Sequence, residues 1–294
     1  MRAFVQAISG SARLRNANFI VIPQNGTEIV TLDGLPTGPP ATDYLAAING
    51  VGREDLLYGY NADDIATPVD QTTRIQGLLD VAEDAGVKAL VTDYCWTTSK
   101  VDDSYARNAA KTYLSFAADH RNLDDIPPYP AVPWAVNTSN TGTLKAAKNF
   151  LYLLDSAPFA TADALVTAIS QTNYDVLVID AFFEATTALT PAQVTALKVK
   201  KNGGRRLVIA YMSIGEAENY RTYWKPEWNT TAPAWLAAEN PSWPGNFKVR
   251  YWQTGWQQVI VGPGGYLQGL LDQGFDGTYL DIIDAFEYFE ANPG

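Results

Sequence analysis

The sequence predicts a single (β/α)8 barrel, and three observations support this fold class. Apolar, β-branched segments alternate with segments of helical spacing, which is the pattern of parallel strands joined by helices. Eight strand candidates occur in 294 residues, a number and a length that fit a barrel. Several of the candidates end in an acidic residue, and strand ends meet at the mouth of a barrel. A doubly wound open sheet is the alternative, but no Gly-rich nucleotide-binding loop follows any strand.

The strand candidates are short apolar runs bounded by turn residues, as expected for strands buried on both faces. In chain order they are residues 18–23, 54–60, 88–94, 150–154, 174–180, 206–211, the less regular 248–252, and 276–281. Helix signals separate them. Residues 67–68 predict a helix start that Gly86 closes, and Thr190 with Gln193 predicts a capping box. Residues 161–171 and 266–274 also have helical spacing.

The first 14 residues predict an amphipathic helix with Phe4, Val5 and Ile8 on one face. They make a poor signal peptide, because a glutamine interrupts their short apolar stretch. No apolar run approaches the length of a membrane span, so we expect no membrane partner.

Composition narrows the function classes. The formal net charge of −11 argues against nucleic acid as a partner and favours a cationic ligand, although it can also serve solubility alone. Cys95 is the only cysteine, so no internal disulfide can form. His120 is the only histidine and lies in a polar stretch, where we expect a solvated side chain. We therefore expect no zinc site, no metal and no cofactor.

Acidic residues follow many of the predicted strands, and in a barrel they collect at one mouth. They are Glu28, Asp93, Asp155, Asp180, Glu216, Glu218, Asp281 and Asp284. Glycoside hydrolysis needs one carboxyl to protonate the leaving oxygen and another to attack carbon or activate water. Clustered carboxylates raise one another's pKa and can supply both forms. The alternative is that each acid only caps the helix or turn that follows it.

Tryptophan is concentrated in one loop-rich segment. Six of the eight tryptophans are Trp224, Trp228, Trp235, Trp243, Trp252 and Trp256. Indole rings stack on the apolar faces of sugars, but they also pack small satellite cores. We expect one or two stacking platforms and packing roles for the other rings.

Three long blocks carry a family resemblance. They are MSIGEAENYRTYWKPEW, PAWLAAENPSWPGNFKVRYW and GFDGTYLDIIDAFEYF. Together they resemble the endo-α-1,4-polygalactosaminidase family of glycoside hydrolases. The resemblance implies a TIM-barrel enzyme that acts on α-1,4-linked galactosamine polymers. A cationic polysaccharide would give the acidic charge a purpose.

The order of the blocks differs from the family. The segments NFIVIPQNGTEI, GVGREDLLYGYN and ALVTDYCWT resemble parts that follow the YLDIID strand in the family, but here they come first. The resemblance therefore implies one barrel domain, residues 1–294, that is circularly permuted. Residues 1–136 correspond to the family's C-terminal half, 137–148 form a connecting linker, and 149–294 correspond to the N-terminal half.

The resemblance also implies roles for site residues. Asp281 would be the nucleophile of a retaining mechanism, and Glu28 the acid/base, with Glu216 as the alternative. The predicted substrate-binding residues are Asp180, Glu218, Tyr152, Tyr211, Arg221, Trp252 and, near the groove edge, Asp93. We expect a monomer, and the family suggests an extracellular location. Two other functions stay open: a sugar-binding barrel without catalysis, and a hydrolase of another glycan.

Overall fold

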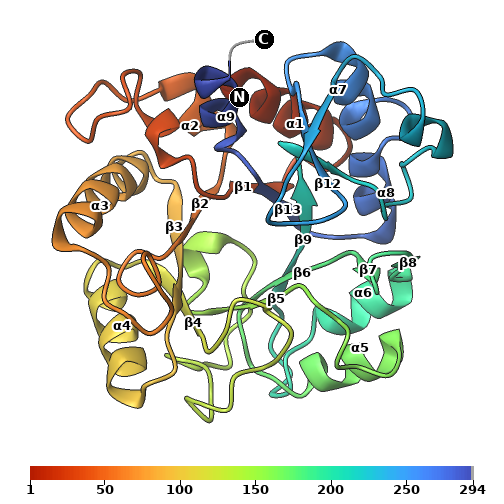
Figure 1. The fold of residues 1–294 in the computed structure, drawn as a ribbon. Coiled ribbons are helices and arrows are strands. Elements are labelled where there is room, and N and C mark those ends of the chain that lie inside the picture. The colour runs from red at the N-terminus through yellow and green to blue at the C-terminus, as the bar shows by residue number, and fades with distance from the viewer. Residues whose placement is uncertain (293–294) are drawn as a thin grey trace.

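The protein has a mixed α/β fold with a parallel central sheet, seen in a computed structural model that describes residues 1–292 (Figure 1). A five-stranded sheet has the order β1-β13-β9-β6-β5, and a three-stranded sheet has the order β2-β3-β4. Every pairing within these two sheets is parallel. The strands are β1 (Ile20–Pro23), β2 (Gly50–Glu54), β3 (Lys88–Tyr94), β4 (Leu114–Ala118), β5 (Phe150–Leu153), β6 (Val176–Ile179), β9 (Leu207–Ser213) and β13 (Gly277–Asp281).

The two sheets adjoin at both of their edges. A parallel bridge joins Gln24, just after β1, to Gly52 of β2. At the opposite edges the rings of Phe116 on β4 and Phe150 on β5 lie 5.8 Å apart. A Cβ at Gly52 would lie 2.0 Å from the hydroxyl of Tyr279, so glycine leaves room for a buried aromatic ring between the sheets. The arrangement resembles a TIM barrel.

Helices lie around the outside of the strands (Figure 1). They are α1 (Arg2–Arg15), α2 (Thr42–Ala47), α3 (Val69–Asp84), α4 (Thr98–Ala110), α5 (Ala162–Ser170), α6 (Pro191–Leu197), α7 (Thr254–Val261), α8 (Tyr266–Gln273) and α9 (Ala285–Ala291). Short 3-10 turns are η1 (Thr27–Val30), η2 (Leu144–Ala146) and η3 (Pro226–Asn229). Within residues 1–292, no helix has both the length and the apolar character needed to cross a membrane.

Local sequence signals explain several helix ends. The capping box at the start of α6 is confirmed, because Thr190 accepts from the backbone of Gln193 and the glutamine side chain accepts from the backbone of Thr190. Gly274 ends α8 in the left-handed region, with φ of 88°, which glycine adopts without strain. The amphipathic α1 buries Phe4, Val5 and Ile8, as the sequence predicts.

Two strand predictions are wrong, and one strand was missed. The segment at residues 248–252 instead contributes to β12 (Asn246–Val249), which pairs antiparallel with β10 (Glu216–Glu218) and β11 (Leu236–Glu239) outside the parallel sheets. The segment at residues 54–60 begins where β2 ends, because Asp55 turns the backbone into the left-handed region. The missed strand is β4, whose alanines suit a helix as well as a strand. Two strands of two residues each, β7 (Phe182–Phe183) and β8 (Thr187–Ala188), pair antiparallel in a short hairpin.

The segment between β4 and β5 is fixed to the rest of the fold by a buried ion pair. Lys200 Nζ lies 2.9 Å from Asp175 Oδ1, and both side chains are fully buried. The same ammonium group donates to the carbonyl oxygens of Asn137 and Ser139 at 3.0 and 2.7 Å. The other oxygen of Asp175 accepts from the backbone of Lys148 and from the side chain of Asn137. The predicted linker is thus bonded near both of its ends to Asp175, which precedes β6, and near its start also to Lys200, which follows α6.

Lys200→Met should destabilise the protein by about 3 kcal/mol, because it leaves the buried Asp175 carboxylate without its cation. Urea unfolding measures the change, and limited proteolysis should show faster cleavage within residues 137–148. The matched control is Lys201→Met, which changes an exposed neighbour. Equal stability of the two variants would contradict the role assigned to this ion pair.

Candidate active site

A cavity of about 640 Å³ lies at the carboxyl ends of the parallel strands. Its walls come from residues at or just after the ends of β1, β2, β3, β5, β6, β9 and β13, which is where barrel enzymes hold their active sites. The acidic residues that line it are Glu54, Asp155, Asp180, Glu184, Glu216, Glu218, Asp281 and Asp284. Two arginines, Arg121 and Arg221, are the cations of the lining. The cavity is therefore strongly acidic.

Asp281 is the last residue of β13 and one of the acidic residues that line the cavity. Its carboxylate accepts from the hydroxyl of Tyr211 at 2.8 Å and from the backbone N–H of Ile282 at 2.7 Å. Ile282 has φ of 57°, which is costly for a β-branched residue and is typical of a functional site. Burial, followed by the nearby negative charge of Glu54, raises the pKa of Asp281 to about 7. This carboxyl can thus exchange a proton near neutral pH.

Glu54 is the carboxylate that the sequence interpretation missed. It ends β2 and lines the cavity. Its oxygens accept from the hydroxyl of Tyr94 at 2.5 Å and from the side-chain amide of Asn25 at 2.9 Å. Its charge acts on Asp281, so the two carboxyls form an electrostatic pair. The available signal was the predicted strand at residues 54–60. That prediction made Glu54 the first residue of a strand, whereas it is the last residue of β2.

Arg221 joins two of the predicted substrate-binding carboxylates. Its Nε donates to Glu218 Oε2 at 2.6 Å, and its Nη1 lies 2.8 Å from Asp180 Oδ2. Burial raises the pKa of Asp180 to about 6, although the positive charge of Arg221 acts to lower it. Tyr220 adds a hydrogen bond from its hydroxyl to Glu218 at 2.9 Å. All four residues line the cavity.

Glu216 lies in the same cavity but is already partnered by a cation. Lys248, its cross-strand neighbour on β12, forms an ion pair with Glu216 Oε1. Asn240 Nδ2 donates to the same oxygen at 2.8 Å. Within residues 1–292, the other oxygen, Oε2, is buried and makes no hydrogen bond. Glu216 is therefore already held by a cation and an amide, an arrangement that suits substrate binding.

Tyrosine hydroxyls line the inner end of the cavity. Tyr152 at the centre of the sheets donates to Gln24 Oε1 at 2.9 Å, and both residues line the cavity. Tyr211 completes this end through its bond to Asp281. At the outer end, Trp243 lines the cavity with 62% of its surface exposed, so an indole face is available for stacking. The sequence had placed Trp243 in the tryptophan-rich segment without assigning it to the groove.

Three of the predicted site residues lie outside the cavity lining. Glu28, in η1, pairs with Arg74 at 2.7 Å. Asp93 is fully buried and accepts from the backbone N–H groups of Leu57 and Tyr58 at 2.7 and 3.2 Å, so it holds the loop after β2. Trp252 is half-exposed and packs edge-to-face on Phe289 of α9. We therefore do not place these three in the substrate groove.

His120 also lies outside the cavity lining. Its ring nitrogens contact the carboxylates of Asp119 and Asp124, and the ring is partly exposed. Across residues 1–292, His120, Asp119 and Asp125 are the one group of three whose ligand atoms are close enough for a metal ion, 4.8 Å or less apart. The cavity itself contains carboxylates, tyrosines, amides and arginines, which is a set suited to acid–base chemistry on a polar substrate.

A parallel α/β fold that gathers carboxylates at its strand ends is the arrangement of a barrel-type carbohydrate hydrolase. The sequence profile of glycoside-hydrolase family GH114 matches residues 133–293, more than half of the chain. The chain belongs to this family.

Three curated relatives match parts of the chain, and each bears the name "Uncharacterized protein". The protein of Deinococcus radiodurans is 40% identical over 129 residues, 44% of this chain and 39% of its own. That of Thermotoga maritima is 35% identical over 153 residues, 51% of this chain and 45% of its own. MJ1477 of Methanocaldococcus jannaschii is 38% identical over 156 residues, 53% of this chain and 43% of its own. The chain thus matches less than half the length of each relative.

One solved structure is similar over a short part. It is the crystal structure of Aspergillus fumigatus Ega3 in complex with galactosamine, which is 23% identical, has a TM-score of 0.29 and covers 39% of each chain. A TM-score of this size does not establish a shared fold.

The raised pKa of Asp281 predicts a pH-dependent gain in stability for Asp281→Asn. The folded protein holds the Asp281 proton more tightly than the unfolded chain does, so this stabilisation is complete below about pH 4 and is lost as the pH rises through about 7. Asparagine removes the buried charge, and the variant should therefore melt higher than the wild type at pH 8. The difference should shrink at pH 5, as followed by circular dichroism.

The control for this experiment is Asp84→Asn, which changes an exposed carboxylate at the end of α3. A pH-independent effect of Asp281→Asn, or a lower melting temperature at pH 8, would contradict the assignment of a buried and unfavourable charge to Asp281.

Proposed function

We propose that this protein is an endo-acting glycoside hydrolase that cleaves an α-1,4-linked, galactosamine-containing polysaccharide by a retaining, two-carboxylate mechanism. The observation that carries the proposal is the pair of Asp281 and Glu54, which end two parallel strands and act on each other inside one acidic cavity. Family membership supports the reaction class. The resemblance of the long motif blocks to polygalactosaminidases supports the sugar and the linkage.

Asp281 suits the nucleophile. Tyr211 and the backbone N–H of Ile282 hold its carboxylate in one orientation. One carboxylate oxygen attacks the anomeric carbon, and the bond from that carbon to the leaving oxygen breaks, which forms a glycosyl–Asp281 ester. The leaving oxygen takes a proton from the acid/base carboxyl. Water then attacks the same carbon and gives a proton to the acid/base, which releases Asp281.

Glu54 is the acid/base that the geometry favours. Glu28 lies outside the cavity lining in an ion pair with Arg74, and Glu216 is already engaged in an ion pair with Lys248. Glu54 lines the cavity, and its charge is one of the causes of the raised pKa of Asp281, so the two carboxyls lie within electrostatic reach of each other. Glu216 then binds substrate rather than transferring protons.

The charge of the cavity favours a cationic substrate. Eight carboxylate side chains and two arginines line it, so an ammonium group on a galactosamine unit would be attracted. An ammonium group bound near Asp281 would favour the ionised carboxylate and lower its pKa from about 7. A cationic sugar would thus increase the fraction of active nucleophile, which a neutral sugar would not do.

Incubation with partly deacetylated α-1,4-galactosamine polymer should release short oligosaccharides that mass spectrometry detects. Asp281→Asn should release none, because asparagine cannot form the ester. Glu54→Gln should lower kcat by roughly 10²–10⁴-fold, the usual contribution of a general acid. It should recover its first step on a substrate with a good leaving group, which needs no proton.

Glu28→Gln is the matched control, and it should keep near wild-type activity. Loss of activity in Glu28→Gln together with retained activity in Glu54→Gln would reverse the acid/base assignment. Intact polymer after incubation with folded wild-type protein would overturn the substrate. Binding without cleavage would favour a sugar-binding barrel, and cleavage of another polysaccharide in a panel would favour a hydrolase of that glycan.

We further propose that the eight parallel strands close into one TIM-barrel domain whose chain order is circularly permuted. The bridge between β1 and β2 and the ring contact between β4 and β5 support closure. Permutation is supported by the order of the motif blocks. It is also supported by the position of α9, which lies beside the N-terminal end of α1 (Figure 1). Residues 137–148 would then join the two halves, 1–136 and 149–294.

A variant with its two ends joined by a short Gly-Ser linker and opened at Gly142 tests this connectivity. A Cβ at Gly142 would meet nothing within 4 Å, so opening the chain there disturbs little packing. The variant should have the same far-ultraviolet circular dichroism and the same products as the parent. Failure to fold with several linker lengths would contradict the proposed closeness of the ends.

A further inference from the structure

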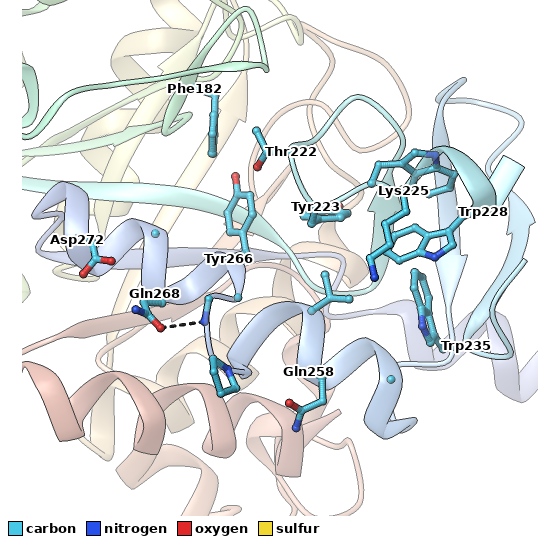
Figure 2. Close-up of a pocket in the computed structure, with 17 residues that line it drawn as sticks. Phe182, Thr222, Tyr223, Lys225, Trp228, Trp235, Gln258, Tyr266, Gln268 and Asp272 are labelled. Atoms are coloured by element: carbon cyan, nitrogen blue, oxygen red, sulfur yellow. Dashed lines mark hydrogen bonds between the residues drawn. The ribbon is translucent and has the colours of Figure 1, made fainter.

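A second cavity, of about 840 Å³, lies between the β10–β11 loop and helices α7 and α8 (Figure 2). Its volume is in the range of roughly 300–1,000 Å³ that is typical of small-molecule sites. It shares no lining residue with the acidic cavity. Three of the tryptophans that the sequence singles out, Trp224, Trp228 and Trp235, form one of its walls.

The tryptophans form a continuous aromatic wall. The rings of Trp224 and Trp228 meet edge-to-face with centroids 5.4 Å apart, and those of Trp228 and Trp235 do so at 5.0 Å. Trp235 is buried, whereas Trp224 and Trp228 are only partly buried and keep surface open to the cavity. An indole supported on one side and open on the other can stack on the apolar face of a pyranose ring.

Polar side chains line other parts of the same cavity, as the recognition of sugar hydroxyls requires. Gln258, Gln268 and Lys225 are exposed lining residues from three different segments (Figure 2). Gln268 is oriented by the bond from the backbone N–H of Gly264 to its Oε1 at 3.0 Å, which leaves the amide NH₂ as a donor. An aromatic wall with amide and ammonium groups at its edge fits a sugar better than a purely apolar ligand.

A glycine of α8, Gly269, lines the second cavity. Gly269 lies inside α8, where glycine costs about 1 kcal/mol relative to alanine. Packing does not require glycine there, because a Cβ would meet nothing within 4 Å. The missing side chain therefore preserves open space in the cavity. Tyr266, on the same helix, also has a buried hydroxyl that finds no hydrogen-bond partner within residues 1–292.

The second cavity and the acidic cavity are lined by neighbouring residues of the same two loops. Phe182 follows Asp180 by two residues, and Tyr223 follows Arg221 by two, so the loops that place the charged residues in the acidic cavity place these rings in the second one. The guanidinium carbon of Arg221 lies 5.9 Å from the centroid of the Phe182 ring. The two cavities are therefore lined by the same two loops.

We propose that the second cavity is a non-catalytic binding site for a pyranose unit of the polysaccharide, separate from the point of cleavage. This inference rests on the proposed function for the identity of the polymer. The ligand stacks on the tryptophan wall and bonds to the amide groups at the edge. Occupation of this site retains a long polymer at the enzyme between cleavage events, and a short oligosaccharide gains nothing from it.

The test compares Gly269→Trp, which adds a large side chain to the lining of the cavity, with Gly269→Ala, which adds a single methyl group. Polymer binding is measured in the Asp281→Asn background by calorimetry, and hydrolysis of long and short substrates is measured with Asp281 intact. Gly269→Trp should weaken polymer binding about tenfold, the scale of one lost aromatic stacking contact. It should slow hydrolysis of long polymer at low concentration and leave short oligosaccharides unaffected. Gly269→Ala should match the parent throughout.

The outcomes separate this inference from the proposed function. If no polysaccharide is cleaved but Gly269→Trp weakens binding of one, the site stands and the proposed reaction falls. If polymer is cleaved and the two Gly269 variants behave alike, the reaction stands and the site is overturned. The proposed site is also overturned if the two variants bind every polymer equally well, or if neither variant binds any polymer. Circular dichroism confirms that Gly269→Trp is folded.

Discussion

The buried guanidinium of Arg221 is the interaction on which the geometry of both cavities depends. Its side chain is 3% exposed and bridges Asp180, just after β6, to Glu218 on β10. A planar guanidinium can satisfy two carboxylates in fixed directions, which an ammonium group on a flexible stem cannot do. Without Arg221, two buried negative charges would lie unpaired beside each other, and the loops that carry them would separate. Those loops also carry Phe182 and Tyr223 into the second cavity.

The acidic cavity stores unfavourable electrostatic energy that a substrate can relieve. Burial raises the pKa of Asp281 to about 7 and that of Asp180 to about 6, so burial disfavours the ionised forms of both side chains. Tyrosine hydroxyls offset part of this cost through bonds to Asp281 and Glu54. The remainder is a driving force for binding positive charge. Stability is therefore lowered at the place where a cationic ligand would bind, as is usual for functional sites.

The sequence predicts the fold more securely than the site. Six of the eight parallel strands could be located because buried strands consist of uninterrupted apolar residues. The prediction for β2 began where that strand ends, and β4, with its alanines, has no such signature. An acidic residue after a strand indicates only the correct end of the sheet. It does not tell whether the side chain turns inward like Asp281, binds a loop backbone like Asp93, or meets a surface arginine like Glu28. These outcomes depend on tertiary contacts.

Glu54 shows why register matters most at a strand end. The residues after it, Leu56 and Leu57, are fully buried and apolar, so the sequence alone extends the strand forward through them. In the structure the backbone N–H groups of Leu57 and Tyr58 donate to the Asp93 carboxylate instead of to a neighbouring strand. The strand β2 therefore ends at Glu54, whose carboxylate lines the cavity. Asp93 thus has a positioning effect on the site without lining it.

The cavity draws its chemistry from both halves of the chain. Glu54 and Tyr94 come from residues 1–136, whereas Asp180, Tyr211 and Asp281 come from residues 149–294. The carboxylate pair therefore depends on the pairing of β1 with β13 over four residues, from Ile20 opposite Gly277 to Pro23 opposite Leu280, and on the bridge from Gln24 to Gly52 of β2. Strand pairing does not depend on the order in which the segments are joined, because the connections run through the outer helices and loops. A change of chain order can thus leave the site unchanged, provided that the strand neighbours are kept.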